Sequence, residues 1–243
     1  MRLKNLFIVV CLFAIAMAFL ESAIVVYLRE LYYPEGFDFP LRSVPVHIAV
    51  TEFFREVATL VMLAGIGYMA GKRPVTRFAW FLFSFAIWDI FYYVFLYVLI
   101  GWPQSLFTWD ILFLVPFVWV GPVIAPVINS LMMIVLAVLI IRANRGVEIL
   151  RIQRLEWLLL ALGSVVVIAA FTEEYISFMN AQGAMGDLLC FRNSGRIIEL
   201  TSQYCPQRFA WQVFIAGIAM HATAILRYFL RAKKSGLLCC CLK

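Results

Sequence analysis

The sequence predicts an all-α integral membrane protein, a bundle of six transmembrane helices with both chain ends in the cytoplasm. Of its 243 residues, 65% are hydrophobic and 14% are charged, whereas a soluble domain is about half apolar and about a quarter charged. The apolar residues form runs of about 20, the length of a membrane-spanning helix and not the alternating decamers of a barrel strand. Lys and Arg concentrate in alternate connections between these runs.

The apolar runs place the six spans at about 5–28, 47–70, 78–101, 118–141, 156–178 and 209–230, in a single polytopic membrane domain over 1–243. The chain starts like a signal peptide, with Arg2 and Lys4 before an apolar run. That run continues past Glu21 to Leu28, which is too long for the hydrophobic region of a signal peptide. We therefore expect it to be retained as the first helix.

Positive charge orients the bundle. Fourteen of the 20 Lys and Arg residues fall on the side that holds both termini, five fall on the other side, and Arg55 lies within a span. Because cytoplasmic loops carry the excess of Lys and Arg, both termini are predicted to be cytoplasmic, with loop 179–208 outside a plasma (inner) membrane. The net charge of +6 follows from this asymmetry. The predicted partner is therefore the lipid bilayer and not a nucleic acid.

Prolines interrupt the approach to the fourth span. Trp102 and Trp109 fit an aromatic belt at the outer interface, and Pro116, Pro122 and Pro126 follow. Since proline breaks the hydrogen bonds of a helix interior, this stretch is either a short re-entrant or interfacial segment or the broken, kinked outer end of the fourth helix. Both alternatives remain open from the sequence.

The outer loop 179–208 carries two cysteines, Cys190 and Cys205, fifteen positions apart. In an oxidising compartment such a pair is expected to form a disulfide. No His lies between them, so a metal site is disfavoured, and we expect the disulfide to be structural.

Carboxylates at membrane depth are the main functional signal, because a charged group inside a span is costly and marks a site by default. Glu52, Arg55 and Glu56 are spaced i, i+3 and i+4, so they share one face of a helix. At about 1.5 Å of rise per residue, Asp89 lies about 18 Å below the outer end of its span. We expect an outward-facing acidic cavity whose candidate binding residues are Glu21, Glu52, Arg55, Glu56, Asp89, Tyr92, Tyr93, Glu173 and His221.

Structural alternatives exist for several of these residues. Arg55 could simply tie two helices together through one glutamate. Glu173 lies near a helix end, where it could reach the interface, and an isolated His221 could be a satisfied core histidine. Tyr92 and Tyr93 follow Asp89 at i+3 and i+4, where their hydroxyls could bind it or line the same space.

No cofactor is predicted. His47 and His221 differ in depth by about 18 Å, which disfavours them as the two axial ligands of one haem. A carboxylate-bound cation on Glu52, Glu56 and Asp89 remains open, because oxygen ligands suit Mg, Ca or Mn. No catalytic motif is present in the sequence, so the pattern leans against an enzyme.

Three functions fit these features. The first is a transporter or channel for protons, cations or a small solute. The second is a non-catalytic subunit or anchor of a larger membrane complex. The third is an intramembrane enzyme or binding site for a lipid or quinone in the outer leaflet, with Arg55 gripping a phosphate or carbonyl group.

Overall fold

The computed structural model describes residues 2–115, 117–190 and 192–237. In this part of the chain six helices are long and apolar enough to cross a membrane, which confirms the predicted multi-pass bundle. They are α1 (Leu3–Tyr32), α2 (Val46–Ala70), α3 (Pro74–Ile100), α4 (Ile124–Ala143), α5 (Arg154–Ala181) and α8 (Trp211–Lys234).

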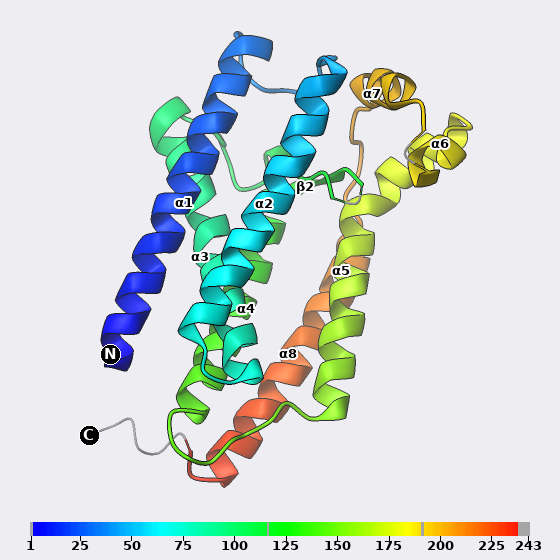
Figure 1. The fold of residues 1–243 in the computed structure, drawn as a ribbon. Helices are drawn as coiled ribbons and strands as arrows, with labels where there is room; N and C mark the ends of the chain where they lie inside the picture. The colour runs from blue at the N-terminus through cyan, green and yellow to red at the C-terminus, as the bar shows by residue number, and fades with distance from the viewer. Residues whose placement is uncertain (1, 116, 191, 238–243) are drawn as a thin grey trace.

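The long helices pack in a definite order (Figure 1). Helix α3 is the centre of one group, because it packs on α1, α2 and α4, whereas α5 packs on α8 and α8 reaches back to α4. The largest apolar cluster joins the two groups where Trp80 and Phe83 of α3 meet Ile140 of α4 and Tyr228 of α8. Helices α2 and α5 thus belong to different groups.

Helix α3 begins and ends at residues that suit those positions. Pro74 occupies the first turn, where the missing N–H has no helical acceptor anyway. Gly101 closes the helix with a φ of 66°, in the left-handed region that glycine adopts without strain. The predicted start at 78 is therefore four residues late.

A β-hairpin precedes α4, which the sequence did not predict. Strand β1 (Trp109–Phe113) pairs antiparallel with β2 (Trp119–Pro122), with Asp110 opposite Gly121. Helix α4 begins only at Ile124, about six residues after the approximate start of the predicted fourth span.

The physical reason lies in the residue types of the segment. The strands are rich in aromatic and β-branched residues, which favour extended backbone. Pro122 ends β2, and Pro126 sits in the first turn of α4, where a proline costs no helical hydrogen bond. Pro116 lies outside the described residues. The re-entrant interpretation of the segment stays a prediction.

The loop between α5 and α8 contains two short helices, α6 (Met185–Cys190) and α7 (Ser194–Gln203). The predicted Cys190–Cys205 disulfide is wrong in this structure: both thiols are free and exposed. Cys190 ends α6, and Cys205 follows α7 on its far side. The ten residues of α7 rise about 15 Å, whereas the Cα atoms of a disulfide lie within about 7 Å.

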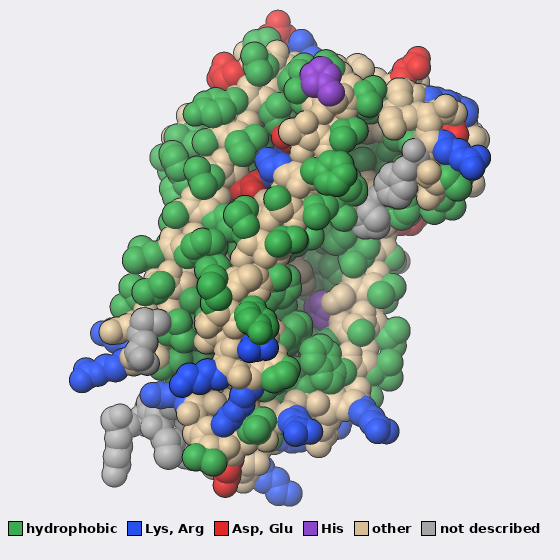
Figure 2. Space-filling view, viewed as in Figure 1, with side chains coloured by type: hydrophobic (Ala, Val, Ile, Leu, Met, Phe, Trp, Pro, Cys, Tyr) green, Lys and Arg blue, Asp and Glu red, His purple; other side chains and the backbone are tan. Residues whose placement is uncertain are grey.

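Charge is distributed unevenly along the bundle. Figure 2 shows Lys and Arg side chains gathered at the end that holds both termini, while the outer segment with α6 and α7 lies at the opposite end. The cations that alternate connections carry in the sequence thus lie together at one end of the bundle. The N-in, C-in orientation remains a prediction based on this asymmetry.

Candidate functional site

A cavity of about 370 Å³ lies between α1, α2, α3 and the hairpin, with α7 at its margin. Seven of the nine predicted site residues line it, from three different helices. These seven are Glu21, Glu52, Arg55, Glu56, Asp89, Tyr92 and Tyr93. Four of the five acidic residues that line this cavity were thus predicted from the sequence, the exception being Asp110.

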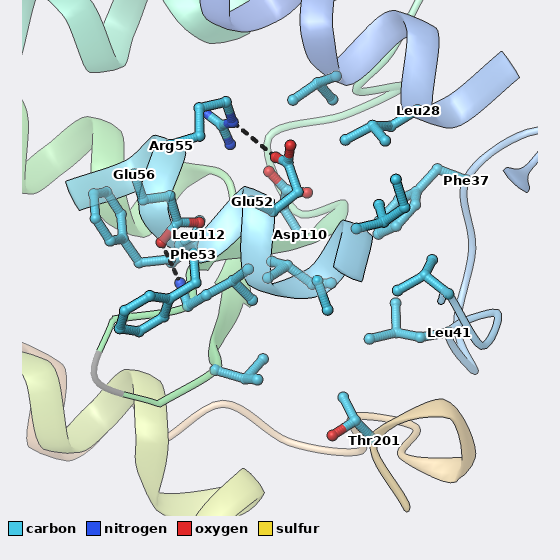
Figure 3. A pocket seen from close by; sticks show the side chains of 18 of the residues that line it. Leu28, Phe37, Leu41, Glu52, Phe53, Arg55, Glu56, Asp110, Leu112 and Thr201 are labelled. Atoms are coloured by element: carbon cyan, nitrogen blue, oxygen red, sulfur yellow. Dashed lines mark hydrogen bonds and ion pairs between the residues drawn. The ribbon is translucent and has the colours of Figure 1, made fainter. Parts of the chain in front are cut away.

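Arg55 is the centre of one charged group. Its Nε donates to Glu52 Oε2 at 2.7 Å, and its guanidinium also pairs with Glu21 of α1. The Thr59 hydroxyl, one turn further along α2, donates to the same Glu21 carboxylate. Figure 3 shows Glu52, Arg55 and Glu56 projecting from α2 at the cavity. Arg55 thus both links α1 to α2 and lines the cavity.

Glu56 is buried and pairs differently. Its Oε2 accepts a hydrogen bond from the backbone N–H of Leu114, just beyond β1, at 2.8 Å. Among the described residues no Lys, Arg or His forms an ion pair with it. The contact joins α2 to the hairpin and leaves Glu56 without a cation of its own.

Asp89 is the second carboxylate of this kind. Its Oδ2 accepts a hydrogen bond from the Ser130 hydroxyl of α4 at 2.7 Å, and it too forms no ion pair within the described ranges. A buried carboxylate held by one neutral donor is incompletely compensated. Asp89 and Glu56 are therefore the two acids with the greatest capacity for an added positive charge.

A second charged group, Arg29 with Asp110, was not predicted as part of the site. Arg29 Nη2 lies 3.3 Å from Asp110 Oδ1, and the Tyr93 hydroxyl donates to Asp110 Oδ2 at 3.3 Å. The guanidinium carbon lies 3.7 Å from the ring centroid of Trp102 and 4.4 Å from that of Phe37. Burial raises the pKa of Asp110 to about 7, although the Arg29 charge opposes that rise.

The sequence offers only a weak signal for this pair. By position Arg29 is one of the outer loop cations, and Asp110 falls in a polar connection between spans. The run Trp109–Phe113 is short, apolar and bounded by turn residues, as buried strands are. Interpreting it as a strand would have placed Asp110 inside the fold. Tyr93 then binds Asp110 and not the neighbouring Asp89 of its own helix.

Two predicted residues lie elsewhere. Glu173 does not line the cavity; its side chain is 47% exposed and pairs loosely with Arg208 at 3.4 Å. His221 is buried between α5 and α8, with Nε2 3.3 Å from both the Ser164 hydroxyl and the Leu160 carbonyl oxygen. His221 is thus a core histidine with local partners, and Glu173 belongs to the surface.

The carboxylates do not form a metal cluster. Within residues 2–115, 117–190 and 192–237, no three His, Cys, Asp or Glu side chains are placed to hold a metal ion. Glu52 is engaged by Arg55, Glu56 by the hairpin backbone and Asp89 by α4. The three acids considered as cation ligands are therefore held apart by different partners.

No protein-family model, curated protein or solved structure matches this chain.

Proposed function

We propose that this protein is a carrier or channel that binds a proton or a small cationic solute in the carboxylate-lined cavity. One observation carries the proposal: carboxylates from α1, α2, α3 and β1 line the same cavity. If each acid served a separate contact between two helices, the acids would have no reason to line one cavity. Convergence of ionisable groups within membrane helices is typical of ion and substrate pathways.

The charge balance of the cavity supports a cationic ligand. Arg55 is shared by Glu21 and Glu52, and Arg29 is paired with Asp110. Glu56 and Asp89 remain with neutral donors. A positive group entering the cavity gains electrostatic energy from two carboxylates that form no ion pair within the described residues, and low local dielectric strengthens that attraction.

Orientation follows from the same reasoning as the topology. With the Lys- and Arg-rich end in the cytoplasm, the cavity faces outward, toward the side of α6 and α7. The proposed location is a plasma (inner) membrane, with the cavity open to the outer side. A cation would then meet the acids before it meets the basic cytoplasmic end.

Purified protein in liposomes tests the proposal. Entry of protons, sodium and tetramethylammonium is measured under a valinomycin-imposed potential, with a pH-sensitive dye inside for protons and labelled ions for the others. We expect Glu56→Gln and Asp89→Asn to lower the rate for the transported cation at least about tenfold, as loss of one charge contact worth about 1.4 kcal/mol would.

Glu173→Gln is the matched control, because this glutamate lies outside the cavity and is exposed. Its rate should equal that of the unaltered chain. The proposal is wrong if both cavity variants transport at the original rate, or if none of the three cations enters faster than into protein-free liposomes.

Binding of a lipid or quinone is a second candidate, supported by a separate observation. Most side chains around the cavity are apolar, among them Val25, Leu28, Ile48 and Phe53. The space-filling view is hollowed between α2 and α5 (Figure 2), the two helices that belong to different packing groups. An apolar molecule in the bilayer would approach the cavity from that side.

A further inference from the structure

We infer that the ligand of the cavity is an amphipathic organic cation: an ammonium group with an oxygen close to it and an apolar chain. The inference rests on the proposed function and narrows its ligand to one chemical class. It joins two observations that are otherwise in conflict, acids without a cation partner and walls that are mostly apolar.

The walls exclude a bare inorganic ion as the best ligand. Leu112, Phe117 and Val118 of the hairpin segment face the same space as Phe53 of α2 and Tyr175 of α5. An inorganic divalent cation needs about six oxygen ligands, and the described residues offer no group of three acidic or His/Cys side chains. A ligand that buries apolar surface against these walls gains affinity in proportion to the area removed from water.

Aromatic side chains line the same cavity as Glu56 and Asp89. Trp88, next to Asp89 in α3, stacks on Tyr92 with ring centroids 6.3 Å apart and 30° between the planes. Its ring also meets Phe113 edge-on at 6.4 Å, and Phe113 precedes the Leu114 whose N–H binds Glu56. Aromatic faces beside carboxylates are the arrangement that recognises alkylammonium groups.

Trp88 adds a second requirement. It lines the cavity and is only 7% exposed, yet its indole N–H has no hydrogen-bond partner among the described residues. Leaving a buried donor unpaired is unfavourable, and indole N–H can only donate. An acceptor oxygen on the ligand would satisfy it once the indole N–H, sealed from the cavity in this structure, turns toward the ligand, whereas an ammonium group alone would not.

Arg29 strengthens this requirement. Its Nη1 is also buried without a hydrogen-bond partner in the described part of the chain, and it lines the same cavity. Two residues of the cavity wall therefore carry donors that no described residue accepts, in addition to the acids without an ion-pair partner. A hydroxyl or carbonyl oxygen near the ammonium group complements both, which a simple proton or sodium ion cannot do.

Three probes separate these elements of recognition. Choline carries a quaternary ammonium and a hydroxyl, 3,3-dimethyl-1-butanol has the same shape without the charge, and hexyl(2-hydroxyethyl)dimethylammonium adds an apolar chain. Binding is measured by calorimetry with the protein in lipid nanodiscs, against empty nanodiscs. We expect choline to bind at least tenfold tighter than the neutral alcohol, and the hexyl compound at least tenfold tighter than choline.

Variants assign the effect to residues. The double variant Glu56→Gln/Asp89→Asn should bind the hexyl compound at least tenfold more weakly, and Trp88→Phe, which keeps an aromatic face and loses the N–H, several-fold more weakly. Glu173→Gln should bind like the unaltered chain. Thermal unfolding of each variant checks that weaker binding does not reflect loss of the fold.

The inference is overturned if choline and its neutral analogue bind equally, if the apolar chain adds nothing, or if the double variant binds unchanged. Its failure differs from failure of the proposed function. Proton or sodium entry that depends on Glu56 and Asp89, without binding of the ammonium probes, overturns only the ligand class. Ammonium binding without transport overturns only the carrier role.

Discussion

Arg55 is the residue on which the charge balance of the cavity depends. A guanidinium has a planar fork of donors, and here it serves Glu52 one turn away on α2 and Glu21 on α1. Removing it would leave two carboxylates facing each other with one hydroxyl, that of Thr59, as donor. Most of the lost stability would come from the buried acid left without a cation and not from the loss of the ion-pair contact itself.

Arg55→Met is therefore expected to destabilise the protein by about 3 kcal/mol. Glu21→Gln in the same chain should recover part of that loss, because only Glu52 then remains as an acid without its cation. A coupling free energy of about 1–3 kcal/mol is expected from the double-mutant cycle. Unfolding in mixed micelles with increasing SDS gives the four stabilities. Strict additivity of the two changes would show that Arg55 and Glu21 do not interact.

At the scale of elements, small residues let α5 and α8 approach closely. A Cβ at Gly217 of α8 would lie 2.9 Å from the carbonyl oxygen of Gly163 and 2.7 Å from a Val167 methyl group. A Cβ at Gly163 would in turn meet the His221 ring at 2.6 Å. Small residues at helix interfaces are the usual means of close packing in membranes. His221 is thus part of this contact and not of the cavity.

Gly217→Val should separate α5 from α8 and lower stability by about 1–3 kcal/mol, since the added atoms meet backbone. Gly65→Val on α2 is the matched control: it is also a helical glycine, and a Cβ added there would meet no described atom within 4 Å. Thermal unfolding in one detergent compares them. Equal melting temperatures for the two variants would contradict the close approach.

For the whole molecule, the unequal charge of the two ends predicts how the bundle crosses the membrane. Cys190 and Cys205 are exposed and free at the end with α6 and α7, while Val147 between α4 and α5 is 93% exposed at the other end. Chain topology and thiol state can therefore be read in one labelling experiment, with the remaining cysteines replaced by serine.

A membrane-impermeant maleimide applied to intact cells should label Cys190 and Cys205 without prior reduction. Val147→Cys, in a chain lacking other cysteines, should react only after the cells are permeabilised. Labelling of Val147→Cys in intact cells would reverse the orientation. If the two native thiols react only after reduction, Cys190 and Cys205 are joined by a disulfide in cells.

Several features followed from the sequence with little room for alternatives. Runs of about 20 apolar residues have no stable place in water, so six spans and their approximate limits were determined by composition and length. Acids inside those runs were costly enough to mark a site. Four of the five acids so marked line one cavity.

Two predicted site residues, Glu173 and His221, lie outside this cavity. They were selected by depth along a helix, but depth says nothing about the direction in which a side chain points around the helix axis. That direction depends on which neighbours the helix packs against, here α8 against α5. The Cys190–Cys205 pair was judged by spacing, and the helix α7 between them keeps its two ends apart.

The sequence by itself determined that this is a six-helix membrane protein with buried acids, because hydrophobic length and charge cost are local properties of the chain. Only the tertiary structure decided that the chain before α4 forms a hairpin, that Asp110 and Arg29 join the cavity, and that Arg55 forms ion pairs with Glu21 and Glu52 but with neither Glu56 nor Asp89. Those facts depend on contacts between residues far apart in the chain, such as Glu56 with Leu114 and Arg29 with Asp110.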